Sequence, residues 1–524
     1  MLSVENLSMA IHGTPILNGV SFEIGRGEVF GLVGESGSGK SMTALGVMRL
    51  EPRGAEVSGR VLLEGKDLMR EPESRMNALR GREIGMIFQE PMTALNPVKT
   101  IGDQVAETLL VHDAADRASA RKVAAERLAR VGLDPDKVPL SRYPHELSGG
   151  QRQRVCIAMA VALRPKLLIA DEPTTALDVT TQAQILKLLK SLVEEDGMSL
   201  MLITHDLAVV AGMAHHVAVM RDGGIVEQAP TARLFRERAH PYTAKLFSDS
   251  GHVPRREPDT SVKPVLQVLG ATRDYPVGSS LFGPRQHFRA VDDVDLTVYE
   301  GESVGLVGES GCGKSTLTRA ILGLDPLEGG SIELDGTPVI AGQVPHALRR
   351  GMQVVFQDPY GSFNPRHRVG RLVAEPFHLD SVPETERDRR VAEALEAVGL
   401  TPADRDKYIH EFSGGQRQRI AIARAIVIRP RLLILDEAVS ALDVSIRAQI
   451  LDLLADLQQR FRLSYLFISH DLSVVRAITD RVLVMQAGRI VEEGETGTVL
   501  TAPQHPYSRK LIAAVPRIPE AWVA

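Results

Sequence analysis

The pattern of apolar and polar positions predicts strands along the first third of the chain. Residues 2–11 and 15–24 alternate apolar and polar side chains, which is typical of antiparallel strands with one buried face. Short continuous apolar runs at residues 28–33, 167–171 and 199–205 indicate strands that are buried on both faces. The sequence therefore predicts both an antiparallel sheet and a parallel core sheet.

Apolar residues at helical spacing separate these strands. The spacing predicts helices over residues 41–50, 150–165 and 180–196, and a helical insertion over residues 100–131. Hairpins are expected around residues 55–70 and 218–228. Taken together, the elements predict an α/β fold with a mostly parallel core sheet, an antiparallel β subdomain and a helical subdomain.

The second half of the chain repeats this order of elements. Late landmarks of the two halves, such as Ser148 and Ser413 or His240 and His505, lie 265 positions apart. We therefore predict one nucleotide-binding domain over residues 1–247 and a second over residues 265–524. Residues 248–264 mix proline, glycine and charge without apolar periodicity, which predicts a linker.

Composition and charge restrict the class of protein. The net charge is −5, from 61 basic and 66 acidic residues, so electrostatics gives no reason to expect a nucleic-acid partner. We see no N-terminal signal pattern and no apolar run long enough to span a bilayer, and we expect a cytoplasmic chain. Cys156 and Cys312 form no disulfide or metal-ligand pattern, and we expect both to stay reduced.

A phosphate-binding loop follows a buried strand in each half. Its glycines let backbone N–H groups surround phosphate oxygens at the start of a helix, its lysine reaches the β and γ phosphates, and its last serine helps to hold Mg²⁺. One copy would be a moderate signal, and two copies in the same context predict two sites for nucleoside triphosphate. The predicted nucleotide-binding residues are Gly34, Glu35, Ser36, Gly37, Ser38, Gly39, Lys40, Ser41 and Met42, and Gly308, Glu309, Ser310, Gly311, Cys312, Gly313, Lys314, Ser315 and Thr316.

Polar residues after the later strands complete a candidate hydrolytic site in each half. A carboxylate that ends an apolar strand can hold Mg²⁺, the next glutamate can polarise the attacking water, a glutamine can bind the ion or the water, and a histidine can contact the γ-phosphate. Standing alone, each would have a plainer interpretation: a common acidic pair, a surface glutamine or a structural histidine. The candidates are Asp171, Glu172, Gln89 and His205 in the first half, and Asp436, Glu437, Gln357 and His470 in the second.

A Ser-Gly-Gly-Gln segment also occurs once in each half. Two glycines after a serine at a helix start can form a second anion site. The plainer interpretation of one copy is a helix cap with serine as its N-cap residue. The segments are Ser148, Gly149, Gly150 and Gln151, and Ser413, Gly414, Gly415 and Gln416.

The full ordered set of motifs resembles that of the ATP-binding-cassette (ABC) ATPases over nearly the whole chain. The resemblance implies ATP and Mg²⁺ as cofactors and two cassettes that face head to tail. It implies that one ATP lies between Gly34–Ser41 and Ser413–Gln416, and the other between Gly308–Ser315 and Ser148–Gln151. Residues 176–178 and 441–443 match the family's loop that crosses between cassettes. Since Glu172 and Glu437 are both present, we predict two hydrolytically competent sites.

Narrower features resemble one branch of that family. The segments QEPMTALNP, QDPYGSFNP, HPYT and HPYS are similar to those in ATPase subunits of bacterial oligopeptide, dipeptide and nickel importers. Two fused cassettes resemble the tandem subunits of microcin C-type peptide and glutathione importers. The resemblance implies two integral membrane permease subunits, a periplasmic solute-binding protein, one copy of this chain per transporter and a place on the cytoplasmic face of the inner membrane.

Other classes remain as alternatives to a peptide importer subunit. A glutathione or nickel importer would use the same ATPase residues. A soluble tandem-cassette ATPase acting on ribosomes or DNA is disfavoured because the junction is short and broken by prolines, and because the charge is not basic. An exporter ATPase is disfavoured by the importer-like segments, and a regulator without hydrolysis by the two glutamates.

Three positions depart from the family pattern or from the other half. The family often stacks adenine on an aromatic residue; Tyr275 fits this role in the second half, whereas the first half has Ile11 and His12. The second half has Glu437-Ala438-Val439 where the first has Glu172-Pro173-Thr174. Cys312 lies in the second phosphate loop, where a helix N-terminus could lower its pKa, although a small spacer equivalent to Ser38 is the plainer interpretation.

Overall fold

The computed structural model describes residues 1–175, 177–256, 261–277, 286–358, 361–380, 382–440 and 442–522, without the side chains of Met92, Val277 and Gln286. The chain forms two compact units. The first contains residues 1–177, 181–250 and 516–524, and the second contains residues 178–180 and 251–515. Each unit holds one of the two predicted halves, and the last residues of the chain belong to the first unit.

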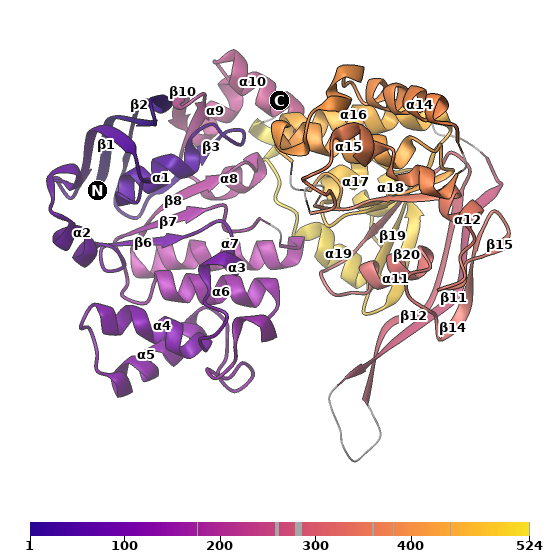
Figure 1. Ribbon diagram of the computed structural model, residues 1–524. Coiled ribbons are helices and arrows are strands. Elements are labelled where there is room, and N and C mark those ends of the chain that lie inside the picture. Colours follow the sequence, from indigo (N-terminus) through magenta and orange to yellow (C-terminus); the bar gives the residue numbers. More distant parts are fainter. Residues whose placement is uncertain are drawn as a thin grey trace. The chain divides into compact units, whose positions relative to one another are not determined.

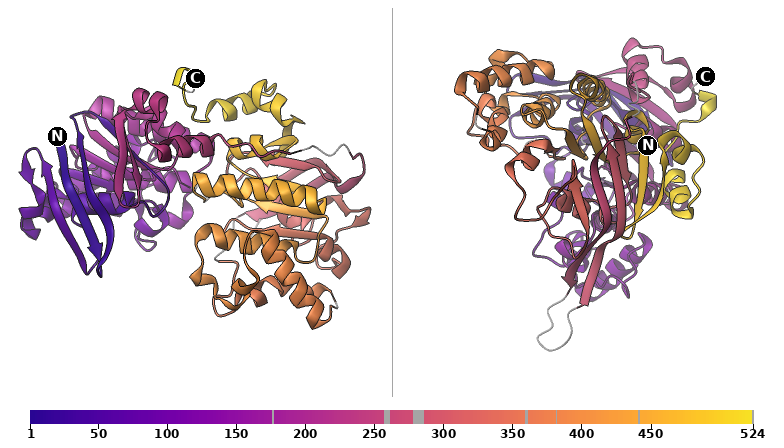
Figure 2. Two further views of the ribbon diagram at one scale, coloured as in Figure 1. Left: turned by 90° about the horizontal axis from the view of Figure 1, so that it is seen from above. Right: turned by 90° about the vertical axis from the view of Figure 1, so that its right-hand side faces the viewer.

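The first unit contains two sheets. The antiparallel sheet has the order β2-β1-β4-β5, and the core sheet has the order β10-β9-β3-β8-β7-β6. Figure 2 shows the N-terminal pair β1 and β2 side by side, in indigo. The strands are β1 Leu2–Ile11, β2 Thr14–Ile24, β3 Val29–Val33, β4 Ala55–Leu63, β5 Lys66–Asp67, β6 Ile84–Ile87, β7 Leu167–Asp171, β8 Ser199–Thr204, β9 His216–Arg221 and β10 Gly224–Pro230.

The core sheet is parallel from β9 to β6, and only β10 runs antiparallel, at its edge. Strands β3, β7 and β8 are buried along their whole length, which explains their continuous apolar sequences. The antiparallel strands alternate buried and exposed residues because one face packs on the core. The fold class that we predicted from the two kinds of pattern is confirmed.

Helices cover the core sheet and form the helical subdomain. Helices α4, α5 and α6 pack against one another at one end of the first unit (Figure 1). The helices of the first unit are α1 Lys40–Met48, α2 Glu73–Leu79, α3 Pro91–Ala94, α4 Ile101–Val111, α5 Arg117–Arg130, α6 Gly149–Ala160, α7 Val179–Asp196, α8 Leu207–Met213, α9 Thr231–Glu237 and α10 Pro241–Ser250, with short 3₁₀ turns at Leu68–Arg70, Pro144–Glu146 and Glu520–Trp522.

The second unit repeats the two sheets, in the orders β12-β11-β14-β15 and β16-β17-β18-β13-β19-β20. Its antiparallel pair β11 and β12 is longer than the equivalent pair β1 and β2, and it extends beyond the rest of the unit (Figure 1). The strands are β11 Pro264–Val277, β12 Gln286–Tyr299, β13 Ser303–Val307, β14 Gly329–Leu334, β15 Thr337–Pro338, β16 Met352–Val355, β17 Leu432–Asp436, β18 Ser464–Ile468, β19 Arg481–Gln486 and β20 Arg489–Glu495.

The helices of the second unit follow the same order as those of the first. The predicted insertion between the glutamine and the Ser-Gly-Gly-Gln segment is helical in both units. They are α11 Lys314–Ile321, α12 His346–Gly351, α13 Val369–Val373, α14 Glu384–Ala397, α15 Gly414–Ile426, α16 Val444–Phe461, α17 Leu472–Ile478, α18 Thr496–Thr501 and α19 Pro506–Ala513, with 3₁₀ turns at Glu375–Leu379, Pro402–Asp406 and Ile409–Glu411.

The junction between the halves is helical at its start and extended after it. Helix α10 continues to Ser250, and residues 252–256 have no regular structure. Residues 257–260 of the predicted linker lie outside the described residues. Among the described helices, none has the length and apolar character that crossing a membrane would require.

Candidate functional site

The candidate site residues of each unit meet at one edge of its core sheet. Strands β3, β8, β7 and β6 are neighbours and run parallel, so their carboxyl ends share an edge. The phosphate loop follows β3, His205 follows β8, Asp171 ends β7 and Gln89 follows β6. In the second unit β13, β18, β17 and β16 place the second phosphate loop, His470, Asp436 and Gln357 in the same way. This edge is where open α/β sheets bind their ligands.

The first phosphate loop is held by its own lysine and ends at a glycine with a left-handed backbone. Gly39 is the N-cap residue of α1 at φ 103°, a conformation that residues with a side chain rarely adopt. A Cβ atom there would also lie 2.8 Å from Leu17 Cδ2 and 2.9 Å from Met220 Cε. The Lys40 ammonium is buried and donates to the carbonyl oxygens of Gly34 and Glu35, both at 2.8 Å. The loop therefore closes around the lysine, with Met42 in the first turn of the helix.

The second phosphate loop has the same geometry. Lys314 Nζ donates to the carbonyl oxygens of Gly308 at 2.8 Å and Glu309 at 2.9 Å, and Thr316 lies in the first turn of α11. Cys312 is buried with its Sγ 3.8 Å from Lys314 Nζ. Burial raises the pKa of the Cys312 thiol, although the Lys314 ammonium opposes the shift. The lowered pKa that a helix N-terminus could have produced is therefore not found, in agreement with the plainer interpretation of Cys312 as a small spacer.

Asp171 is a buried carboxylate with an unsatisfied oxygen. Its side chain is almost fully buried, and its Oδ1 atom has no hydrogen-bond partner. Burial raises the pKa of Asp171, while a hydrogen bond from Ser41 and the charge of Lys40 act in the opposite direction. The structure thus brings Asp171 and Ser41, two predicted Mg²⁺ ligands, into contact. A buried unpaired carboxylate oxygen is costly unless a cation satisfies it, and carboxylate and hydroxyl oxygens suit Mg²⁺.

Glu172 is the most strongly perturbed acid of the first site. Its carboxylate accepts from Gln89 Nε2 at 3.1 Å and from Thr175 Oγ1 at 2.8 Å, and lies 3.4 Å from His205 Nδ1. Burial alone would raise the pKa of Glu172, but the hydrogen bond and charge of His205, with smaller effects of Thr175 and Lys40, lower it to about 2. Its backbone is left-handed, with φ 46°. The Glu172 side chain is therefore an ionised carboxylate in a fixed position at neutral pH.

The second site has the same acids, and among the described residues fewer side chains contact its glutamate. Glu437 also has a left-handed backbone, at φ 52°, and its Oε1 lies 3.1 Å from His470 Nδ1. Burial would raise the pKa of Glu437, but His470 lowers it; burial would lower the pKa of His470, but Glu437 raises it. Ser440 takes the place of Thr175, and its hydroxyl donates to the main-chain carbonyl of Glu437. Asp436 matches Asp171 in that burial raises its pKa.

The Ser-Gly-Gly-Gln segments begin helices α6 and α15. Ser148 is the N-cap residue: its Oγ accepts from Gln151 N at 3.3 Å, and Gln151 Oε1 accepts from Ser148 N at 3.0 Å. Ser413 and Gln416 form the same capping box. The cap interpretation is therefore correct for both copies. It does not use the serine proton or the first N–H groups of the helix, and Ser148 and Ser413 are exposed to a ligand.

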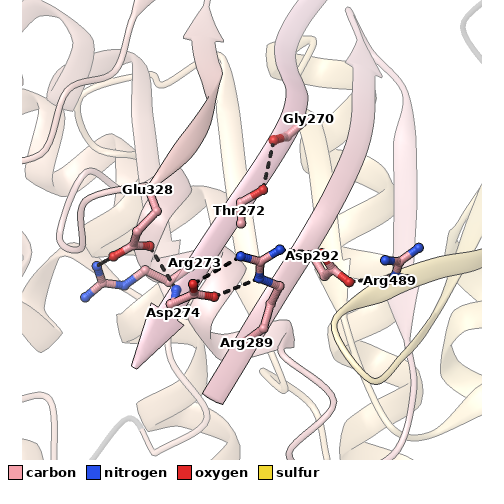
Figure 3. A network of polar contacts seen from close by, with 8 residues as sticks. All are labelled: Gly270, Thr272, Arg273, Asp274, Arg289, Asp292, Glu328 and Arg489. Carbon is pink, nitrogen blue, oxygen red and sulfur yellow. Dashed lines mark hydrogen bonds and ion pairs between the residues drawn. The ribbon is translucent and has the colours of Figure 1, made fainter. Parts of the chain in front are cut away.

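Tyr275, the predicted adenine contact, lies near the end of β11. Its hydroxyl is 3.1 Å from Asp325 Oδ2, and the Arg273 guanidinium lies 4.8 Å from its ring centre. The strand pair around it is held by ion pairs that run across to β20 (Figure 3). These ion pairs join Arg273 to Glu328, Asp274 to Arg289, Arg289 to Asp292, and Asp292 to Arg489. The described contacts leave the role of Tyr275 in binding a base as a prediction.

The sequence did not identify every residue that acts at this edge. Thr175 was not singled out, because a threonine beside an acid pair carries no recognisable pattern. Tyr242 and Tyr507 were noticed only as part of the HPYT and HPYS segments, yet both contact a phosphate loop. Ala176 and Ala441, in the predicted crossing loops, lie outside the described residues.

Comparisons with known proteins agree with this geometry. Residues 17–175 and 291–440 match the family model described as ABC transporter, and residues 226–267 and 491–523 match the one described as oligopeptide/dipeptide transporter, C-terminal region. The chain is 49% identical over 528 residues to the peptidoglycan transport ATP-binding protein YejF of Agrobacterium fabrum, covering 98% of this chain and 96% of the relative. It is 47% identical over 558 residues to the glutathione import ATP-binding protein GsiA of Salmonella paratyphi A, covering 98% and 89%.

Proposed function

This chain belongs to the ABC transporter family, and we propose that it is the ATP-hydrolysing, energy-coupling subunit of a bacterial importer for peptides. The observation that carries the proposal is the pair of complete hydrolytic sites. In each unit a phosphate loop, an aspartate, a glutamate with a lowered pKa and a histidine share the carboxyl edge of one core sheet; the aspartate is buried in the first unit and half-buried in the second.

The residues at this edge suit phosphoryl transfer from ATP to water. Glu172 and Glu437 have pKa values below the ordinary range despite their burial, so each is an ionised carboxylate at neutral pH that can polarise a water molecule in line with the γ-phosphate. His205 and His470 hold these carboxylates through Nδ1 and so fix the direction in which each accepts the proton. Lys40 and Lys314 supply the positive charge at the loops.

Mg²⁺ fits the same edge. The Asp171 carboxylate contacts the Ser41 hydroxyl and has a buried Oδ1 atom without a hydrogen-bond partner, and Asp436 and Ser315 are the equivalents in the second unit. When bound, Mg²⁺ would neutralise charge on the β and γ phosphates. We propose these four residues as its ligands, with Gln89 and Gln357 close enough in the fold to orient the water.

The cargo and partners follow from the relatives and from one surface. The two relatives above are named for peptidoglycan transport and glutathione import, and both solutes contain short peptides. The second unit has a groove of about 1090 Å³ beside Gln357, lined by Phe356, Pro376, Leu379 and Arg424 among others. Its exposed phenylalanine supports docking of a membrane subunit there. We propose two permease subunits, a periplasmic solute-binding protein and one copy of this chain, at the cytoplasmic face of the inner membrane.

Hydrolysis can be tested on the purified full chain. Glu437→Gln keeps the size of the side chain but removes its capacity to accept a proton, so we expect turnover at the second site to stop while ATP still binds, and the total rate to fall by about half. The Glu172→Gln/Glu437→Gln double variant should lose turnover by at least about 100-fold. Glu411→Gln, at an exposed capping residue, is the matched control and should retain turnover. Undiminished hydrolysis by the Glu437 variant would contradict the assignment of the catalytic base.

The importer role needs a transport experiment in cells. A strain without this gene would be complemented with wild type or with the Lys40→Ala/Lys314→Ala double variant, and uptake of oligopeptides, dipeptides, muropeptides, glutathione and nickel would be measured. We expect loss of a peptide class that only wild type restores. Loss of glutathione uptake alone would support the glutathione alternative, which the second relative favours. Unchanged uptake of every solute would contradict the importer role.

A further inference from the structure

The His-Pro-Tyr segments have no part in the proposed mechanism, although both halves contain one. They are His240–Tyr242 and His505–Tyr507, 265 positions apart. Both lie in the segments that match the oligopeptide/dipeptide transporter C-terminal region. The structure shows what each of the three residues does locally, and it does so identically in two independent copies.

The histidine and proline start a short helix in a fixed position. His240 Nδ1 accepts from Tyr242 N, and His505 Nδ1 accepts from Tyr507 N, both at 3.2 Å. The prolines stand at the first helical position of α10 and α19, where no N–H is needed.

A glutamate on the last strand of the core sheet fixes the chain just before each helix. The Glu227 carboxylate accepts from the N–H groups of Ala239 and His240, both at 3.0 Å. The Glu492 carboxylate accepts from those of Gln504 at 2.7 Å and His505 at 3.0 Å. Because β10 and β20 carry these glutamates, each helix start is tied to the core sheet of its own unit.

The tyrosine of each segment reaches the phosphate loop. Tyr242 Oη accepts a hydrogen bond from Glu35 N at 3.4 Å, and Tyr507 Oη accepts one from Glu309 N at 3.0 Å. Glu35 N and Gly34 O belong to one peptide group, and Lys40 Nζ binds that oxygen at 2.8 Å. The first peptide group of each loop is therefore held from both sides, by the tyrosine at its N–H and by the lysine at its carbonyl.

Burial protects the hydrogen bond between each tyrosine hydroxyl and its phosphate loop. Tyr242 and Tyr507 are 7% and 5% exposed, so little water competes for the hydroxyl. Burial, together with the nearby glutamate carboxylate, raises the pKa of each phenol to about 12. The hydroxyl therefore stays neutral. The Arg221 guanidinium lies 4.9 Å from the ring centre of Tyr242 and further restricts the ring.

We propose that Tyr242 and Tyr507 are positioning residues of the two ATP sites. We expect Lys40 and Lys314 to turn part of their ammonium donors toward phosphate oxygens, and the tyrosine keeps the first peptide group of the loop in place at its N–H while they do so. The loop then has its binding shape before the nucleotide arrives. This inference rests on the proposed ATP binding and extends it to the His-Pro-Tyr segments, which supply the support behind each loop.

The test uses full-length chain with the background Glu172→Gln/Glu437→Gln, so that Mg²⁺-ATP binds without turnover. Binding of a fluorescent ATP analogue is measured for Tyr242→Phe, Tyr507→Phe and both together. Each change removes one buried hydroxyl and leaves the ring, so we expect each to weaken one of the two binding phases by about threefold to tenfold. In the wild-type background the KM for ATP should rise by a similar factor, while kcat stays within about twofold, because the tyrosines do not touch the reacting atoms.

Tyr465→Phe is the matched control. Tyr465 is also fully buried and its hydroxyl donates to Leu454 O at 2.8 Å, within the second core sheet and its covering helix. We expect this variant to lose thermal stability without any change in ATP affinity. Equal affinities for all variants, or a loss of stability in Tyr242→Phe and Tyr507→Phe that is the same with and without ATP, would overturn the inference. Failure of the Glu172→Gln/Glu437→Gln chain itself to bind ATP would instead overturn the proposed function.

Discussion

The two glutamates show how much of a site a single residue pattern can identify. The sequence predicts Glu172 and Glu437 as proton acceptors because each follows a strand-ending aspartate, and the structure places both beside a histidine. It does not predict how strongly each is held. Thr175 bonds the first carboxylate, whereas the equivalent Ser440 bonds a main-chain carbonyl. A hydroxyl can turn to either acceptor, so only the folded geometry decides.

The ion pair of His470 with Glu437 makes stability depend on pH. Glu437 raises the pKa of His470 above its ordinary 6.5, so the pair stabilises the fold fully below that pH, and this contribution is lost as the pH rises through the folded-state pKa. On the acid side Glu437, whose pKa is lowered from 4.5, keeps its charge until the pH falls through its own folded-state value. His470→Gln should therefore cost roughly 1 kcal/mol of unfolding free energy near pH 6 and less near pH 9.

The measurement is urea unfolding of both chains across this pH range. His346→Gln, at an exposed residue that starts α12, controls for the loss of an imidazole and should give a small difference at every pH. If the destabilisation by His470→Gln were the same at about pH 6 and pH 9, the ion pair would not be the source of the stability.

At the scale of elements, the apolar patterns predict which segments form helices but not the residues at which each helix begins and ends. The expected helix over 150–165 is observed as α6 Gly149–Ala160, and that over 41–50 as α1 Lys40–Met48. Both predicted starts were late by one residue, because the capping glycine or serine and not the apolar pattern sets the first turn. Helices α4 and α5 confirm the insertion, since their apolar faces pack on α6.

The start of α15 offers a matched pair of glycines with different surroundings. A Cβ atom on Gly415 would lie 2.6 Å from Ile446 Cγ2 on α16, whereas one on Gly414 would meet nothing within 4 Å. Gly415→Ala should therefore destabilise the chain by about 1–3 kcal/mol, because α15 must shift away from α16. Gly414→Ala should leave thermal stability nearly unchanged but lower ATP turnover, since its methyl group would cover the proposed phosphate contact.

Thermal unfolding and ATP turnover of both variants check this difference. Gly149→Ala and Gly150→Ala repeat the comparison in the first unit, where the nearest atoms are Leu177 Cδ2 at 3.8 Å and Thr181 Cγ2 at 2.4 Å. Equal loss of stability for both members of either pair would show that packing does not distinguish the two glycines.

At the scale of the whole molecule, the repeat was predictable and the path of its last residues was not. The common spacing of 265 positions predicts two units of one fold, and each unit has its own pair of sheets. No pattern in the sequence predicts a contact for the C-terminal tail. In the structure residues 516–524 join the first unit, where Trp522 O accepts from Arg238 Nη2 at 3.0 Å. These residues are 284 positions apart, and no local pattern encodes such a contact.

Trp522 is the only tryptophan of the chain, so its fluorescence reports directly on this tail contact. Its ring packs edge-on against Phe235, with centroids 5.6 Å apart, and aromatic pairs of this kind contribute about 0.5–1.5 kcal/mol beyond their buried area. Phe235→Leu keeps an apolar side chain in the core of α9 and removes the ring. We therefore expect the tail to detach more often, and acrylamide to quench Trp522 more strongly, by roughly twofold.

The control for this measurement is Phe356→Leu, which changes an exposed phenylalanine of the second unit and should leave quenching as in wild type. Removal of residues 516–524 should lower the stability of the first unit, because it uncovers the α9 surface on which Trp522 lies. If Trp522 were already quenched as fully as free tryptophan in the wild-type chain, the tail would not be part of the first unit. If quenching increased with Phe235→Leu but not with Phe356→Leu, the C-terminal tail would be a structural part of the first unit.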